Sequence, residues 1–205
     1  EVNFLKKRRL SKEKFDVLKE LANIGVGNAL TSLSKMLNEE KVEMKVPEAT
    51  LAPLQDIPDL LGGAEFPVAG IYIESHGDIG LTILFVLSLD SAYKLISTLM
   101  PDSQGELDEM GLSALLEVGN ILTGSYLNAL SMMTDSRMLP SPPKIAVDMS
   151  GAIISTVIAE ARIVDDEVVI LKTSMNSLQS NISGHILILP DRGSLKKIFT
   201  LLGVR

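Results

Sequence analysis

The chain has 205 residues, with 19 lysines and arginines against 26 aspartates and glutamates and a net charge of -7. A hydrophobic content of 46% and a charged content of 22% are typical of a folded globular protein and exclude a mostly disordered chain. The acidic balance argues against nucleic-acid and membrane-surface binding, which need a strongly basic face. The absence of cysteine excludes disulfides, thiolate nucleophiles and zinc–cysteine sites. No apolar run approaches the roughly 20 residues of a transmembrane helix, so we expect a soluble, cytoplasmic protein without membrane insertion.

The first half of the chain predicts a long helix, three strands and a shorter helix. From Ser11 to Leu37 the apolar residues recur every three or four positions, which is the period of an amphipathic helix, and Ser11 is placed to cap its N-terminus. Extended segments are expected at residues 42–46, 67–74 and 79–87, between Gly, Pro and Asp residues. A helix over residues 90–99 follows.

The second half is predicted to repeat this order. Ser103–Glu106 has the spacing of a capping box, which predicts a second long helix from there to about Met133. Extended segments are then expected at residues 145–149, 153–164, 167–175 and 185–189, and a last helix at 194–202.

The two long helices are similar when Glu20 is laid on Glu117. Identical residues then include an Asn, at Asn23 and Asn120, and a Gly one turn later. We therefore expect a single domain over residues 1–205 made of two repeats, about 11–100 and 106–205. The predicted fold class is α/β, in the broad sense that includes α+β folds. We expect a pseudo-two-fold arrangement of two long helices over an antiparallel sheet, with two shorter helices.

Each long helix has a polar stripe on the side away from its apolar residues. At about 100° per residue, each stripe spans roughly 60°: Asp16, Glu20, Asn23 and Gly27 form the first, and Ser113, Glu117, Asn120 and Gly124 form the second. A carboxylate can pair with a cation of a partner, a carboxamide can orient a water, and a glycine allows close backbone approach. The alternative is that Glu and Asn only form a solvated face and that the glycines serve packing. Because Asn and Gly are both poor helix-interior residues, their recurrence favours a functional stripe.

The double motif resembles the CheC, CheX and FliY phosphatases of chemotaxis. The resembling segments are Asp16–Asn28, DVLKELANIGVGN, and Ser113–Ser125, SALLEVGNILTGS, and similarity extends through nearly the whole chain. Two motifs in one chain resemble CheC rather than CheX, whose chains carry one site. FliY would add a C-terminal flagellar-switch domain, for which the chain ending at Arg205 leaves no room. Asn28 has Ser125 as its counterpart, so the two sites are not expected to be equivalent.

The resemblance implies an enzyme, a phosphatase that hydrolyses the aspartyl-phosphate of the response regulator CheY. In such an enzyme each Asn inserts beside the acyl phosphate and aligns the attacking water, and each Glu holds a lysine of the receiver domain. The resemblance carries the catalytic roles onto Glu20, Asn23, Glu117 and Asn120, and supporting roles onto Asp16, Gly27, Ser113 and Gly124. No cofactor is expected on this chain, because the Mg²⁺ belongs to the phosphorylated receiver.

Other functions stay open at this point. Family members of the CheC type also bind the receptor deamidase CheD, and Asp148 is a candidate contact, with a plain edge-strand charge as the alternative. The chain could be a non-catalytic adaptor that binds CheD or phosphorylated CheY, or a structural component of the flagellar switch. His76 and His185 have no second metal ligand nearby, and we expect both to be structural.

Overall fold

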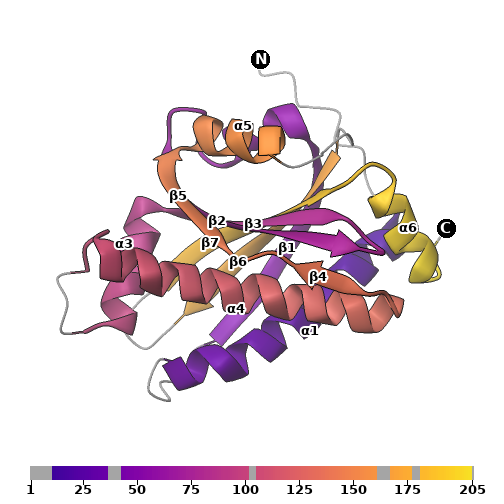
Figure 1. Ribbon diagram of the computed structural model, residues 1–205, viewed down its shortest axis with the longest axis horizontal. Coiled ribbons are helices and arrows are strands. Elements are labelled where there is room, and N and C mark those ends of the chain that lie inside the picture. The colour runs from indigo at the N-terminus through magenta and orange to yellow at the C-terminus, as the bar shows by residue number, and fades with distance from the viewer. Residues whose placement is uncertain (1–10, 37–42, 102–104, 161–166, 177–180, 205) are drawn as a thin grey trace.

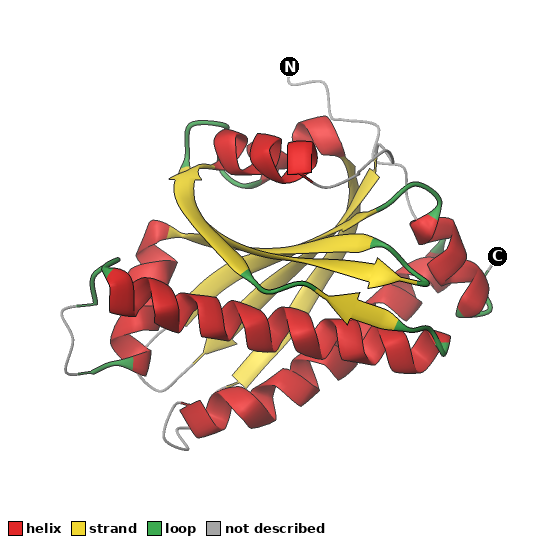
Figure 2. Ribbon diagram, in the orientation of Figure 1, coloured by secondary structure: helices red, strands yellow, loops and turns green. Residues whose placement is uncertain are grey.

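The computed structural model describes residues 11–36, 43–101, 105–160, 167–176 and 181–204 (Figures 1 and 2). The helices in these ranges are α1 (Lys12–Met36), α2 (Ile57–Leu60), α3 (Leu89–Leu99), α4 (Glu109–Thr134), α5 (Ser150–Glu160) and α6 (Ser194–Leu201). The strands are β1 (Glu43–Pro53), β2 (Pro67–Gly77), β3 (Leu81–Ser88), β4 (Met138–Pro140), β5 (Lys144–Met149), β6 (Glu167–Asn176) and β7 (Asn181–Pro190).

The strands of the described residues form one sheet in which neighbours are antiparallel. The order is β1-β6-β7-β3-β2-β4, and β5 pairs with β2 beside β4. The sheet interleaves the two halves of the chain, because β1 pairs with β6 and β5 pairs with β2. Antiparallel pairing in a shared sheet is confirmed, and the limits of the two repeats stay a prediction.

Helices cover both faces of the sheet (Figure 1). Ile83 and Phe85 of β3 face the layer that contains α1 and α4, whereas Leu84 and Val86 face the layer that contains α2 and α5. Because residues along a strand alternate between its two faces, a central strand between two helical layers is apolar throughout. The described residues of the protein therefore form three layers, with α1 and α4 on one outer side.

α1 and α4 lie side by side and run in opposite directions. α1 begins near α6, where Lys14 lies 5.1 Å from the ring centroid of Phe199. α4 begins near α3, at the other end of the molecule in Figure 1. Gly25 brings the two helices close together, because a Cβ there would lie 3.0 Å from the Cα of Tyr126. The remaining sides of the two helices face outward.

The start of α4 differs from the capping-box prediction. Asp108 is the N-cap, and its Oδ1 accepts a hydrogen bond of 2.8 Å from the Gly111 amide. Gly105 has a φ of 71°, which is outside the helical region, and Glu106 precedes the helix. Ser103 lies outside the described residues. For α1 the predicted cap is confirmed, with the Lys14 amide 3.4 Å from Ser11 Oγ.

Removal of the Asp108 side chain is expected to lower the stability of the fold measurably. Asp108→Ala is expected to lower the free energy of unfolding by about 1 kcal/mol, because it leaves the Gly111 amide without its side-chain acceptor. Urea unfolding followed by circular dichroism measures the loss. Asp108→Asn keeps an acceptor oxygen and is the matched control. An equal loss in both variants would contradict the role of the cap.

The segment predicted to be extended at residues 153–164 is helical up to Glu160. Ile153, Ile154 and Val157 are buried and share one helix face, which packs on the sheet. The β-branched residues of this segment favour strands intrinsically, but packing against the sheet overrides that preference. Residues 161–164 lie outside the described residues. The short helix α2 and the strand β4 were not predicted.

Candidate functional site

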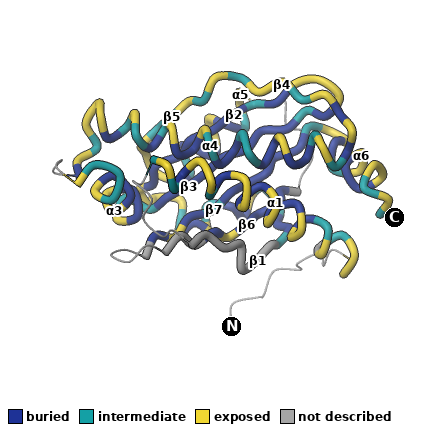
Figure 3. The backbone as a smooth tube through the Cα atoms, turned by 90° about the horizontal axis from the view of Figure 1, so that it is seen from below, coloured by how far each residue is buried: buried dark blue, intermediate teal, exposed yellow. Residues whose placement is uncertain are grey.

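Both polar stripes lie on the outward sides of α1 and α4, where exposed and buried residues alternate (Figure 3). Asp16, Glu20, Asn23, Gly27, Ser113, Glu117 and Asn120 are exposed, and Gly124 is half-buried. The apolar residues expected on the opposite side, such as Leu18 of α1 and Leu115 of α4, are buried. The predicted orientation of the stripes is confirmed, and their catalytic roles stay predictions.

The glycines of the stripes differ from the other glycines of these helices. A Cβ added at Gly27 or Gly124 would meet no described atom within 4 Å. By contrast, a Cβ at Gly119 would lie 2.5 Å from Cγ2 of Ile71 on β2. Packing within the described chain therefore explains Gly119 but does not explain Gly27 or Gly124. Both stripe glycines leave open space on the face that carries the Glu/Asn pair.

The residue one turn before each stripe Asn differs between the two helices. Lys19 precedes Asn23 by four positions, and Leu116 precedes Asn120 by four positions. Lys19 is exposed, whereas Leu116 is half-buried and packs against the core. Neither residue belongs to the predicted stripes, although laying Glu20 on Glu117 places the two at equivalent positions.

Asp148 lies on β5, away from both stripes. It is exposed, and its Oδ1 accepts a hydrogen bond of 2.7 Å from the Met149 amide. Val147 and Met149 on either side are 42% and 49% exposed. Among the described strands β5 pairs only with β2, so it forms part of the edge of the sheet. The role of Asp148 in binding a partner stays a prediction.

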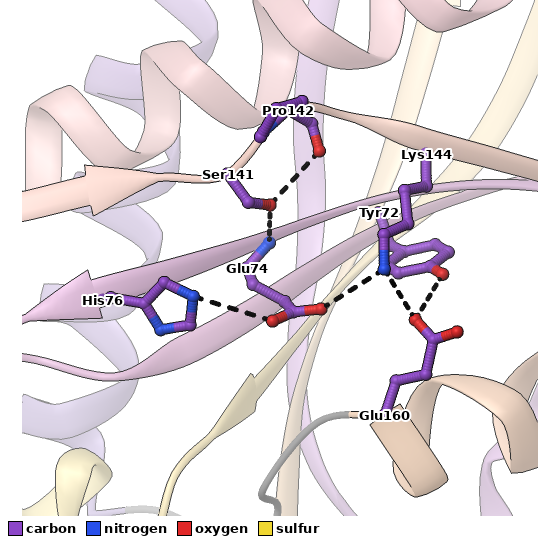
Figure 4. A network of polar contacts seen from close by, with 7 residues as sticks. All are labelled: Tyr72, Glu74, His76, Ser141, Pro142, Lys144 and Glu160. Carbon is purple, nitrogen blue, oxygen red and sulfur yellow. Dashed lines mark hydrogen bonds and ion pairs between the residues drawn. The ribbon is translucent and has the colours of Figure 1, made fainter.

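A polar network fastens β5 and the end of α5 to β2 (Figure 4). Glu160 Oε2 accepts hydrogen bonds from the Tyr72 hydroxyl at 2.7 Å and from Lys144 Nζ at 2.8 Å. Lys144 Nζ also lies 3.8 Å from Glu74 Oε1, and His76 Nε2 lies 3.7 Å from the other carboxylate oxygen of Glu74. The network holds the β5 edge in place and involves no stripe residue.

The protonation of this network follows from its hydrogen bonds. The hydrogen bond from Lys144, and then that from Tyr72, lowers the pKa of the Glu160 carboxyl. The same bond raises the pKa of the Lys144 ammonium. Burial, followed by the hydrogen bond to Glu160, raises the pKa of the Tyr72 phenol. Lys144 and Glu160 therefore form a charged pair at neutral pH.

In the part of the chain that the structure describes, every helix is too short or too polar to cross a membrane.

Comparison with known proteins identifies the family. A model of the CheC-like family matches residues 15–51 and 110–147, which contain every residue of both stripes. The chain is also 35% identical, over 95% of its length, to the CheY-P phosphatase CheC of Bacillus subtilis (strain 168), of which it covers 96%. The chain belongs to the CheC-like family. The resemblance inferred from the double motif is thus confirmed.

Two further matches agree with membership of the CheC-like family. The chain is 32% identical, over 66% of its length, to the flagellar motor switch phosphatase FliY of the same Bacillus strain, of which it covers 36%. The crystal structure of Thermotoga maritima FliY superimposes with a TM-score of 0.74, at 22% identity and with 95% of this chain and 98% of that chain covered. The structural likeness confirms the predicted fold class.

Proposed function

We propose that this chain is a phosphatase that hydrolyses the aspartyl-phosphate of a CheY-type receiver domain. The observation that carries the proposal is an exposed Glu/Asn pair on each of two helices, within a chain closely similar over nearly its full length to a CheY-P phosphatase. A second relative is also named a phosphatase. Because its substrate would be a cytoplasmic response regulator, we propose that the enzyme acts in the cytoplasm.

The proposed chemistry needs positioning of a water rather than a protein nucleophile. Asn23 or Asn120 inserts beside the acyl phosphate, where its carboxamide can accept a hydrogen from a water and donate to a phosphoryl oxygen. Attack of the water on phosphorus breaks the bond to the aspartyl oxygen and yields inorganic phosphate and a free carboxylate. Positioning and electrostatic stabilisation suffice for phosphoryl transfer, and both exposed side chains are free to meet a partner.

The other stripe residues would set the docking of the receiver. Glu20 or Glu117, one turn before the Asn, pairs with a lysine of the receiver and fixes its register. Gly27 or Gly124 provides open space for the receiver's backbone on the same face. The receiver brings the Mg²⁺ that neutralises phosphoryl charge, so the stripe residues do not need to supply it.

The decay of a phosphorylated CheY-type receiver tests the proposal. With magnesium present, the purified full chain is expected to accelerate loss of the phosphoryl group over the rate of the receiver alone. The same assay with boiled protein controls for contaminants in the buffer. If the chain binds the receiver but does not accelerate loss of the phosphoryl group, it is a non-catalytic adaptor and not the proposed enzyme.

We further propose that the β5 edge binds the deamidase CheD. Its exposed residues are Asp148 on one face of the strand and the apolar Val147 and Met149 on the other, and the polar network in Figure 4 fixes its position. An edge that exposes a carboxylate and apolar side chains suits a protein interface. Titration calorimetry with CheD is expected to show binding that Asp148→Lys weakens. Unchanged affinity in this variant would exclude the edge as the contact.

A further inference from the structure

The two stripes differ in charge beside the Asn. Side chains four positions apart on a helix lie about 5–6 Å apart at Cβ, so Lys19 places an ammonium group next to Asn23. Leu116 occupies the equivalent position next to Asn120. Lys19 is exposed and has no ion-pair partner among the residues that the structure describes. Its charge is therefore available to a bound partner.

The first turns of the two helices also differ in charge, and again α1 carries the cation. Lys12 of α1 has Glu109 as its equivalent on α4, and both side chains are exposed. On α1 this surface carries two lysines and three carboxylates, whereas on α4 it carries two carboxylates and no cation. The residues compared are Lys12, Glu13, Asp16, Lys19 and Glu20 on α1, and Glu109, Met110, Ser113, Leu116 and Glu117 on α4.

A phosphorylated receiver responds to this difference. A phosphoryl group carries roughly -1.5 to -2 charge at neutral pH, so a cation beside the docking position attracts it and an acidic surface repels it. Charges at the rim of an interface act mainly on the rate of association and on its salt dependence. The same receiver therefore meets two cations among the carboxylates of α1 and none beside the carboxylates of α4.

We propose that Lys19 is a receiver-binding residue of the α1 site that the α4 site lacks, so that the two sites differ in salt dependence and in the receiver charge they favour. The inference rests on the proposed phosphatase function. The α1 site favours receivers with the more acidic docking surface. At the α4 site Leu116, which packs against the core, stands in place of the charge.

Proteins with one working site test the inference. Asn120→Ala leaves the α1 site, and Asn23→Ala leaves the α4 site. We expect kcat/KM for receiver dephosphorylation at the α1 site to fall about fivefold between about 20 and 500 mM NaCl, and kcat/KM at the α4 site to change by less than about twofold or to rise. In the α1-site protein, Lys19→Leu should remove most of the salt dependence, with the loss in KM rather than in kcat.

Two further variants sharpen the test. Lys35→Leu removes an exposed lysine four turns further along α1 and should leave the salt dependence unchanged. Leu116→Lys in the α4-site protein should introduce salt dependence, with thermal unfolding as the check on its fold. Equal salt dependence of the two sites, or no effect of Lys19→Leu, overturns the inference while the phosphatase function stands. No acceleration by the unaltered chain overturns both.

Discussion

Asn23→Ala combined with Asn120→Ala is expected to abolish the acceleration of receiver dephosphorylation. Each Asn would position the attacking water, and loss of one positioned polar group typically costs about 10²- to 10³-fold in rate. Each single variant should keep the turnover of the other site. The activities of the two single variants and the double variant are measured as the rate of phosphate release from the magnesium-bound phosphorylated receiver.

The fold should survive this double substitution, because both Asn side chains are exposed and lie outside both clusters of the core. Thermal unfolding within a few degrees of the unaltered chain is the expected result. Asn28→Ser is a matched control, since Ser125 stands at the equivalent position of α4, and it should retain α1-site activity. A double variant with undiminished turnover would show that other residues position the water.

Gly119→Ala and Gly124→Ala are expected to change stability in opposite directions. At Gly119 the new methyl would lie 2.5 Å from Cγ2 of buried Ile71, so α4 would have to move off the sheet, at a cost of about 1–3 kcal/mol or more. At Gly124 the methyl meets no described atom within 4 Å, and the higher helix propensity of Ala should add up to about 1 kcal/mol. Urea unfolding of the two variants measures both changes.

Activity measurements on the glycine variants distinguish a role in the stability of the fold from a role in binding the receiver. If a receiver's backbone approaches Gly124, then Gly124→Ala should lower the turnover of the α4 site although the fold becomes more stable. Gly27→Ala should do the same for the α1 site, which also has open space at that position. Stabilised variants with full activity at both sites would mean that the receiver does not use this space.

The long helices and their stripes were predictable because both rest on local periodicity. The spacing of Leu18, Ala22 and Leu33 defines the buried side of α1, so the exposed position of Asn23 follows from the sequence alone. The Ser11 cap was predictable for the same reason, since capping depends on residues within one turn.

The errors arose where distant contacts decide local structure. The segment around Ile153 contains β-branched residues, and only the sheet beneath it makes a helix the better arrangement. The sequence places Gly27 on the polar stripe, but it does not show that Gly25 packs against Tyr126 of the other long helix. The cap of α4 is a local error instead, because Asp108 rather than the predicted Ser103 caps the helix, through a hydrogen bond from the Gly111 amide.

The pairing of β1 with β6 constrains how the chain can mature on a ribosome. β1 ends at Pro53, whereas β6, its one partner among the described strands, begins at Glu167. At a synthesis rate of roughly 5–20 residues per second, β6 is synthesised on the order of ten seconds after β1. Such distant pairing is characteristic of slow folding. The α1 site can therefore reach its final support only after β6 has been synthesised, and a chain terminated before β6 would expose an unpaired edge that favours aggregation.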